Sequence, residues 1–202
     1  LAQVVALLCA QRGLQRQVGH AQDGVHGRAD LMAHVGQEHG LGAGGGFGLV
    51  ARFLQFELGA RALVLDDPQP NAAKARNLGW QQAQGRFVLF LDGDTELHPD
   101  FVVTALDALR EPTLCAAWGH RRESRPQDSV YNRVLDLDWI YPVGETLYFG
   151  GDVLVRREAL VQAGGYDNSL NAGEEPELCA RLRALGWRIE HIDAPMTRHD
   201  LA

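Results

Sequence analysis

Residues 87–94 read FVLFLDGD, and this stretch decides the fold class. Five consecutive apolar residues are typical of a strand that is buried on both faces, as in the parallel sheet of an α/β protein. Asp92 and Asp94 follow one residue apart at the carboxyl end of that strand, where open α/β sheets bind their ligands. Such carboxylates suit Mg²⁺ or Mn²⁺, and the ion can in turn bridge to a substrate diphosphate. The alternative interpretation is a solvated Asp-Gly turn without a ligand.

The segments after residue 60 alternate between apolar runs and amphipathic stretches, which is typical of an α/β domain. Besides the strand at 87–91, we expect strands at residues 62–65, 114–118, 153–155 and 188–192. We expect helices at residues 72–83, from Pro99 onward, at 157–163 and at 176–185, and we leave 130–141 open between helix and extended chain. The pattern places one partial domain at residues 58–202.

Residues 1–57 differ in character from the rest of the chain. They hold 11 of the 23 glycines and four of the eight histidines, and they contain no proline. Only residues 1–10 and 47–58 are periodic enough to indicate short helices, so the segment stays unassigned. The run at 40–45 matches the dinucleotide-binding fingerprint formally. We discount a nucleotide loop there, because no apolar strand precedes the glycines.

The composition excludes several classes of protein. A chain of 202 residues with 46% hydrophobic residues is long and apolar enough to fold as one domain. Its formal charge of -7 has the wrong sign for coating nucleic acid, so we expect no nucleic-acid partner. No apolar run approaches the roughly 20 residues of a transmembrane helix. Three scattered cysteines indicate a reducing compartment, and we expect a cytoplasmic protein.

A second acidic group, Glu174 and Glu175, precedes the helical spacing at 176–185. Carboxylates in a first helical turn are stabilised by the helix dipole, which is the structural interpretation. The functional interpretation makes one of them a general base that takes a proton from an acceptor hydroxyl, and spacing alone does not choose. An aspartyl-phosphate phosphatase is disfavoured, because Thr95 comes one position too early after Asp92 for that motif.

Five blocks in this order resemble the family 2 glycosyltransferases of the GT-A fold, over residues 62–200. The blocks are residues 71–79, 83–94, 149–151 with 156–160, 164–167, and 173–178 with 181–183 and 186–187. The resemblance implies an α/β protein with the GT-A fold of nucleotide-diphospho-sugar transferases. It implies metal-dependent, inverting transfer of a sugar from a nucleotide sugar, a UDP-sugar, to a hydroxyl of a glycan or lipid-linked acceptor. It also places the domain at the inner face of the membrane in full-length relatives.

The resemblance assigns roles to individual residues. Its Asp-x-Asp motif implies that Asp92 and Asp94 contact a Mg²⁺ or Mn²⁺ ion and the donor diphosphate. The family's Glu-Asp pair maps onto Glu174 and Glu175, with Glu175 at the position of the catalytic base, where glutamate replaces the family's aspartate. Arg76 falls where a basic residue approaches the nucleotide, and a solvated helix arginine is the alternative.

Two further sites follow from the same resemblance. Gly150, Gly151 and Asp152 are similar to the acceptor-side loop, where glycine lets the backbone approach a sugar closely. His199, near the end of the chain, is expected as a third metal ligand by similarity to some GT-A enzymes. A histidine exposed on the surface is the alternative for this residue.

The front of the chain departs from the family pattern. Family members begin with a strand, a helix and a second strand whose acidic turn holds the nucleobase and ribose, and residues 1–57 do not match that pattern. We therefore expect a GT-A fold that is incomplete at the N-terminus, and the missing initiator methionine suggests a fragment. The alternative function is a truncated, catalytically inactive fragment that serves at most as a metal- or diphosphate-binding or interaction module. A nucleotidyltransferase is disfavoured, because no glycine-rich loop with a lysine accompanies a first strand.

Overall fold

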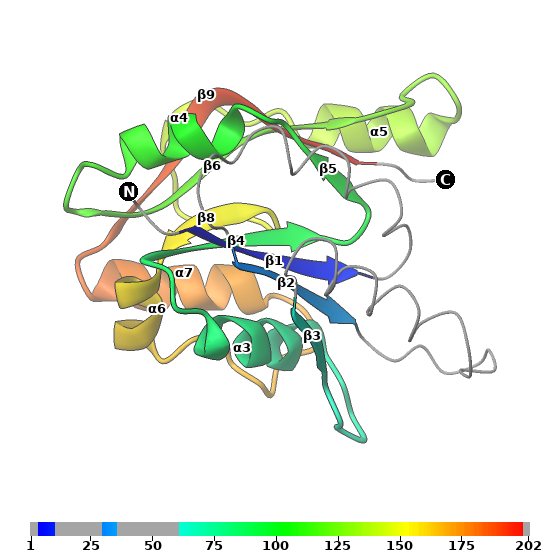
Figure 1. Ribbon diagram of the computed structural model, residues 1–202. Helices are drawn as coiled ribbons and strands as arrows, with labels where there is room; N and C mark the ends of the chain where they lie inside the picture. Colours follow the sequence, from blue (N-terminus) through cyan, green and yellow to red (C-terminus); the bar gives the residue numbers. More distant parts are fainter. Residues whose placement is uncertain (1–3, 11–29, 36–60, 200–202) are drawn as a thin grey trace.

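The computed structural model describes residues 4–10, 30–35 and 61–199, which form an α/β fold with helices on both sides of one mixed sheet (Figure 1). The strands are β1 (Val4–Ala10), β2 (Asp30–Val35), β3 (Arg61–Val64), β4 (Phe87–Asp92), β5 (Thr95–Leu97), β6 (Leu114–Glu123), β7 (Gly144–Glu145), β8 (Val153–Arg156) and β9 (Arg188–His199). The helices are α3 (Ala72–Gln82), α4 (Phe101–Ala108), α5 (Val130–Asp138), α6 (Arg157–Ala163) and α7 (Glu174–Ala184). The strand order is β3-β2-β1-β4-β8-β6-β9-β5, and β7 pairs with β9.

One half of the sheet is parallel and leads to the DGD sequence. β2 pairs in parallel with β1 and β3, and β1 pairs in parallel with β4. The register places Cys9 of β1 beside Asp92 of β4, so both strands end at the same edge. Every residue of β4 ahead of Asp92 is buried, as its apolar run predicts. Asp92 therefore lies at the carboxyl edge of the parallel strands.

The first two strands correct expectations about residues 1–57. The segment expected as a helix at 1–10 contains strand β1 instead. A short apolar run is compatible with either structure, and pairing with β2 and β4 satisfies the backbone hydrogen bonds of the strand. β2 is a parallel strand despite its polar residues, so two strands precede β3 where we expected none. The expected helix at 47–58 and the glycine run at 40–45 lie outside the described residues.

The other half of the sheet is mixed and extends further than the sequence indicates. β8 is antiparallel to β4 and β6, and β6 pairs in parallel with β9 through several register shifts. β6 and β9 continue past their predicted ends, to Glu123 and His199. The register pairs His199 with Glu123 on one side and with Thr95 of β5 on the other. These extensions bring residues from distant parts of the chain to the edge that follows Asp92.

Local signals set the boundaries of the helices. α3 begins after Asn71, whose side-chain oxygen accepts a 2.8 Å hydrogen bond from the backbone N–H of Lys74. α6 ends at Gly164, which adopts a φ of +80°, a left-handed conformation that favours glycine. α7 begins at Glu174, ahead of the expected start, so Glu174 and Glu175 both lie in its first turn. The open segment 130–141 contains helix α5.

The helices cover the sheet on both faces around one hydrophobic core (Figure 1). α3, α6 and α7 lie on one side of the sheet, and α4 packs on the other side against β6 and β9. The largest fully buried side chains include Phe90, Phe101, Phe149, Leu154 and Leu178. Within the described ranges, no helix combines the length and the hydrophobicity that a bilayer crossing requires.

Candidate active site

The candidate site lies at the carboxyl edge of β4, where Asp92 ends the strand. The backbone N–H of Asp92 donates a 2.8 Å hydrogen bond to Oδ1 of Asp152, which lies just ahead of β8. The hydroxyl of Thr95 donates to the backbone carbonyl of Asp92 at 2.8 Å and closes the turn after β4. The hydroxyl of Thr197 donates to Oδ2 of Asp152 at 2.7 Å. These bonds fix the turn at 92–95 against β8 and β9.

Arg76 of α3 holds three carboxylates together, and we call this set of four residues the guanidinium cluster. Its Nη1 lies 2.7 Å from Oε1 of Glu174 and 3.0 Å from Oε1 of Glu175, and its Nη2 lies 3.2 Å from Oδ1 of Asp92. Arg76 and Glu174 are buried, whereas Glu175 keeps 16% of its side-chain surface exposed. Burial raises the pKa of Glu175; the Arg76 charge opposes this effect, and the Glu174 carboxylate reinforces it. Glu175 is therefore the more accessible glutamate and has an increased affinity for a proton.

His199 lies between two other carboxylates, and we call this set of three residues the imidazole cluster. Its Nε2 lies 3.1 Å from Oδ2 of Asp94, and its Nδ1 lies 2.9 Å from Oε2 of Glu123. The Glu123 side chain has no exposed surface, whereas 47% of the Asp94 side chain is exposed. The hydrogen bond between His199 and Asp94 raises the pKa of the histidine and lowers the pKa of the aspartate. The cluster is therefore closed on the Glu123 side and open on the Asp94 side.

Arg121 of β6 lies between the two clusters. Its Nη1 is 3.5 Å from Oδ2 of Asp92, and its Nε is 3.7 Å from Oδ2 of Asp152. Its guanidinium covers the ring of Trp139 at 4.6 Å from the ring centroid. Burial raises the pKa of Asp152 to about 6, although the charge of Arg121 opposes the shift. Asp92 is thus flanked by two guanidinium groups, whereas Asp94 faces an imidazole.

The two glycines of the expected acceptor-side loop differ in their surroundings. A Cβ atom on Gly151 would lie 2.3 Å from Oδ2 of Asp92, so this carboxylate fills the space that a larger residue needs. A Cβ atom on Gly150 would meet no atom within 4 Å. The loop therefore packs tightly against the guanidinium cluster at Gly151 and is open at Gly150.

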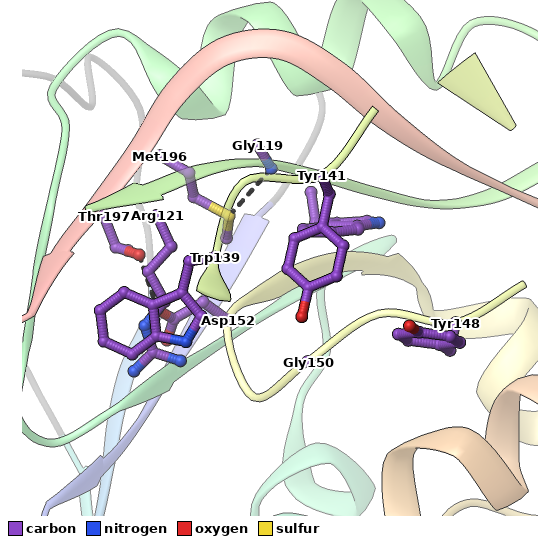
Figure 2. Close-up of a pocket in the computed structure, with 10 residues that line it drawn as sticks. Gly119, Arg121, Trp139, Tyr141, Tyr148, Gly150, Asp152, Met196 and Thr197 are labelled. Atoms are coloured by element: carbon purple, nitrogen blue, oxygen red, sulfur yellow. Dashed lines mark hydrogen bonds and ion pairs between the residues drawn. The ribbon is translucent and has the colours of Figure 1, made fainter. Parts of the chain in front are cut away.

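A pocket opens beside Asp152 and Gly150, with aromatic rings on several sides (Figure 2). Its lining residues are Trp118, Gly119, Arg121, Trp139, Tyr141, Tyr148, Gly150, Asp152, Met196 and Thr197. Figure 2 shows Tyr141 above Gly150 and Tyr148 to its right, with Arg121, Trp139 and Asp152 grouped together. Apolar walls with a few polar groups are typical of a small-molecule site.

The structure brings the expected site residues to one edge of the sheet, in two groups. Asp92, Arg76, Glu174 and Glu175 meet in the guanidinium cluster, and Asp94 meets His199 in the imidazole cluster. Arg76 is 5% exposed and His199 is 7% exposed. The alternatives of a solvated arginine and a surface histidine are therefore wrong.

Arg121, Glu123 and the aromatic lining of the pocket are not predicted from the sequence. The charged residues at 120–123 follow an apolar run and are typical of a solvated strand end. A signal that could have found them is the two-residue alternation of a strand that continues. Arg122 is exposed at 59% of its side-chain surface, between the largely buried Arg121 and the buried Glu123.

A divalent cation fits the imidazole cluster. Asp94 and His199 present a carboxylate oxygen and a ring nitrogen 3.1 Å apart. Neighbouring ligands of an octahedral ion bound at about 2.1 Å lie about 3.0 Å apart, so the observed pair matches that spacing. In the part of the chain that the structure describes, no three His, Cys, Asp or Glu side chains form a ready-made metal cage. Two protein ligands suit an ion that also binds water and substrate phosphates.

Solved structures with a similar fold include glycosyltransferases. TarS 1–349 of S. aureus in complex with UDP-GlcNAc gives a TM-score of 0.76 at 13% identity, covering 99% of this chain and 59% of that chain. GalNAc-T7 with UDP, GalNAc and Mn²⁺ gives 0.75 at 13% identity, covering 99% and 44%. The mannosyltransferase PcManGT from Pyrobaculum calidifontis in complex with GDP-Man and Mn²⁺ gives 0.69 at 17% identity, covering 100% and 57%. The fold is therefore the GT-A fold.

The family model of glycosyl transferase family 2 matches residues 49–161, and the chain belongs to this family. The amylovoran biosynthesis glycosyltransferase AmsB of Erwinia amylovora is 27% identical over 157 residues, which cover 69% of this chain and 50% of that protein. A pre-mycofactocin glycosyltransferase of Mycobacterium tuberculosis is 26% identical over 151 residues, covering 68% of this chain and 32% of that protein. The chain thus spans half or less of the length of these relatives. Residues 1–48 lie outside the family match, in agreement with the departure noted at the front of the chain.

Proposed function

We propose that the chain contains the catalytic core of a metal-dependent, inverting glycosyltransferase. It transfers a sugar from a UDP-sugar to a hydroxyl group of a glycan or lipid-linked acceptor. The observation that carries the proposal is the presence of two separate acidic clusters at the carboxyl edge of β4. The imidazole cluster offers ligands to a cation, and the guanidinium cluster presents a glutamate whose proton affinity is increased.

Asp94 and His199 are the residues that we assign as protein ligands of a Mn²⁺ or Mg²⁺ ion, with Asp92 facing the donor beside them. An ion held by these two residues would supply positive charge next to the leaving nucleoside diphosphate. The chain has a formal charge of -7, so a bound cation would offset its electrostatic repulsion of an anionic nucleotide sugar. The Mn²⁺ ions in the structures of GalNAc-T7 and PcManGT support a divalent ion in proteins of this fold.

Glu175 is the residue that we assign as the general base, with Glu174 beside it. Inverting transfer needs a base that takes the proton from the acceptor hydroxyl as the new bond forms. Nη1 of Arg76 contacts both glutamates, at 2.7 Å and 3.0 Å, and so holds the Glu175 carboxylate in place. The raised pKa of Glu175 makes it a stronger proton acceptor than a solvated glutamate. Glu174 is the more buried of the two and serves mainly to fix Arg76.

Arg76 and residues 150–152 complete the assignment. Arg76 brings positive charge to Asp92 at the edge where the donor diphosphate is expected, which supports its role beside the nucleotide. Gly150 and Asp152 line the aromatic pocket, which we assign to the acceptor, and Gly151 lies between them in the chain and packs against Asp92. The UDP of the TarS and GalNAc-T7 complexes supports a UDP-sugar donor, and the GDP-Man of PcManGT makes GDP the necessary comparison.

Calorimetry with UDP and Mn²⁺ on the wild-type chain and on Asp94→Asn tests the cation site. We expect Mn²⁺-dependent UDP binding in the wild type. Binding by Asp94→Asn should be weaker by about tenfold or more, because one of the two protein ligands of the ion loses its charge. Asp107→Asn is the matched control: Asp107 is an exposed aspartate on α4 that pairs with Arg110 at 3.0 Å. Equal binding by the wild type and Asp94→Asn would overturn the assignment, and preference for GDP would change the donor.

A donor-hydrolysis assay separates the enzyme from the alternative of an inactive fragment. The alternative of an inactive fragment assumed that the first strands of the fold are missing. The structure has β1 paired with β4 and β2 paired with β3. We expect slow, saturable release of UDP from a UDP-sugar with Mn²⁺, and its loss in Asp94→Asn. Binding without any turnover would favour the inactive module.

A further inference from the structure

Glu123 has no part in the chemistry proposed above, yet its side chain has no exposed surface. Burying a carboxylate is unfavourable unless partners compensate its charge and its lone pairs. The hydrogen bonds to Glu123 come from Nδ1 of His199 at 2.9 Å, Nδ2 of Asn132 at 3.3 Å and the backbone N–H of Arg125 at 3.3 Å. Among these donors His199 is the one that can carry charge. The burial of Glu123 is therefore tied to His199.

The contact with Glu123 determines what the other nitrogen of His199 can do. In a neutral imidazole one nitrogen carries the hydrogen and the other carries a lone pair. A carboxylate that accepts from Nδ1 places the hydrogen there and leaves the lone pair on Nε2, which faces Oδ2 of Asp94 at 3.1 Å. In the neutral ring that lone pair and that oxygen repel each other, and either a proton on Nε2, as in the hydrogen bond described above, or a metal cation between the two atoms removes the repulsion. The arrangement suits a cation held by both atoms.

Helix α5 supports this arrangement from behind. Asn132 of α5 donates to Oε1 of Glu123, and the N-cap residue Ser129 accepts a 3.1 Å hydrogen bond from the backbone N–H of Asn132. The ring of Trp139, which follows α5, meets the ring of His199 edge-on at 5.0 Å between centroids. The imidazole is thus held at Nδ1 and against one edge, while Nε2 points to the more exposed Asp94.

We propose that Glu123 is a positioning residue for the cation, which acts by fixing the tautomer of His199 so that Nε2 is the nitrogen that binds the metal. The proposal rests on the proposed function, because it assigns a role within the same cation site. Carboxylates commonly accept the second N–H of a metal-binding histidine, and removing them weakens metal binding about ten- to a hundredfold. Glu123 therefore contributes to metal affinity without touching the metal or the substrate.

Mn²⁺ affinity without a donor, measured from the free-ion signal in electron paramagnetic resonance, tests the role of Glu123. We expect Glu123→Gln to bind Mn²⁺ about ten- to a hundredfold more weakly than the wild type, because the amide keeps the shape but loses the charge that holds Nδ1–H. Asp136→Asn is the control for a loosened contact between α5 and β6. The buried Asp136 accepts two 2.7 Å hydrogen bonds from Arg122 and one at 3.0 Å from the backbone N–H of Glu123.

The control variant should lose stability and keep its Mn²⁺ affinity. Equal losses of affinity in Asp136→Asn and Glu123→Gln would overturn the proposal, since both would then reflect structure alone. A third outcome separates the two proposals: the wild type and Glu123→Gln bind Mn²⁺ equally well, and Asp94→Asn does not bind it. In that case this inference fails while the proposed function stands. If the wild type binds no Mn²⁺, the cation site and this inference fail together.

A second measurement on the wild type does not depend on how the variants fold. A long-range ¹H–¹⁵N correlation spectrum in the presence of diamagnetic Mg²⁺ reports which ring nitrogen of His199 carries the hydrogen. We expect the signature of an Nδ1–H tautomer for His199. An Nε2–H tautomer would overturn the proposal, because Nε2 could not then bind the ion.

Discussion

The guanidinium cluster and the imidazole cluster lie at the same edge of the sheet. They differ in the basic side chain that neutralises their carboxylates, which is Arg76 in the first and His199 in the second. In the first, Arg76 contacts Asp92, Glu174 and Glu175, and a guanidinium keeps its proton at every physiological pH. In the second, His199 contacts Asp94 and Glu123, and an imidazole can give up a proton and offer a lone pair. Asp92 and Asp94 are one residue apart, yet they belong to different clusters.

This difference separates two tasks within one small site. In the function that we propose, a cation replaces the proton of this imidazole, so the imidazole cluster would alternate between a protonated and a metal-bound form. The guanidinium cluster has no such exchange, and Arg76 instead holds Glu175 in one place with its pKa raised by burial. The comparison therefore predicts that substitutions in the two clusters affect different measurements.

Removing Arg76, the positively charged residue of the guanidinium cluster, should have the largest effect. We expect Arg76→Met to lower the free energy of unfolding by about 3 kcal/mol at pH 8, because buried carboxylates lose their counter-charge. The loss should shrink toward pH 5. Without Arg76 no positive charge opposes the burial that already raises the pKa of Glu175, so its folded-state pKa lies above the unfolded one; this penalty is present above the folded-state pKa and disappears as Glu175 is protonated. Urea denaturation at the two pH values measures both effects.

Lys74→Met is the control for Arg76→Met on the same helix. Lys74 pairs with Asp67 at 2.9 Å, and both side chains are partly exposed, so its loss should change stability by less than about 1 kcal/mol. A similar, small effect of both variants would show that the carboxylates around Arg76 rearrange or take up protons without cost. The contrast between the two clusters would then lose its energetic basis.

Glu175→Gln should have the next largest effect, and on turnover alone. We expect transfer to fall by about 10²-fold while Mn²⁺ and UDP affinities stay unchanged, because the base touches neither ligand. In the wild type, activity should fall at acid pH as Glu175 is protonated, at a higher pH than for an ordinary glutamate, and the variant should lack this limb. Initial rates of transfer measured from about pH 5 to about pH 9 give the pH profile of each protein.

Two variants on α7 complete the test of Glu175. Glu177→Gln changes a glutamate in the same first turn that pairs with Arg181 at 2.6 Å, and it should leave the rate unaltered. Glu174→Gln should affect stability more than turnover. If Glu174→Gln loses turnover and Glu175→Gln keeps it, the two roles must be exchanged.

The parts of the fold with long or bounded signals could be predicted from the sequence. The run 87–91 gives strand β4, and Asn71 and Gly164 mark the ends of α3 and α6 as their capping chemistry predicts. Strand β1 was mistaken for a helix because seven residues hold too few periods to distinguish the two patterns. The extensions of β6 and β9 depend on their mutual pairing, which is a contact between residues distant in the sequence.

The residues of the candidate site likewise include some that the sequence could predict and others that it could not. Asp92, Asp94, Glu174 and Glu175 could be selected because each pair stands next to a boundary of a strand or helix. Their division into two clusters could not, because it depends on which base reaches each carboxylate. The two-residue alternation of a strand places Arg121 and Glu123 on one face but does not show that this face is buried. Their burial results from the register of β6 against β9, and the paired residues are about 75 positions apart in the chain.

Gly151→Ala should have the smallest effect and gives the sharpest test of the separation between the clusters. The added Cβ would lie 2.3 Å from Oδ2 of Asp92, so the carboxylate must move within the guanidinium cluster, at a cost of about 1 to 3 kcal/mol in stability. Gly150→Ala, where a Cβ meets nothing within 4 Å, is the matched control and should be nearly neutral. Mn²⁺ affinity should stay close to the wild-type value in both variants, because Asp94 and His199 are not displaced. If affinity falls in Gly151→Ala alone, Asp92 belongs to the cation site together with Asp94, as the Asp-x-Asp resemblance implies.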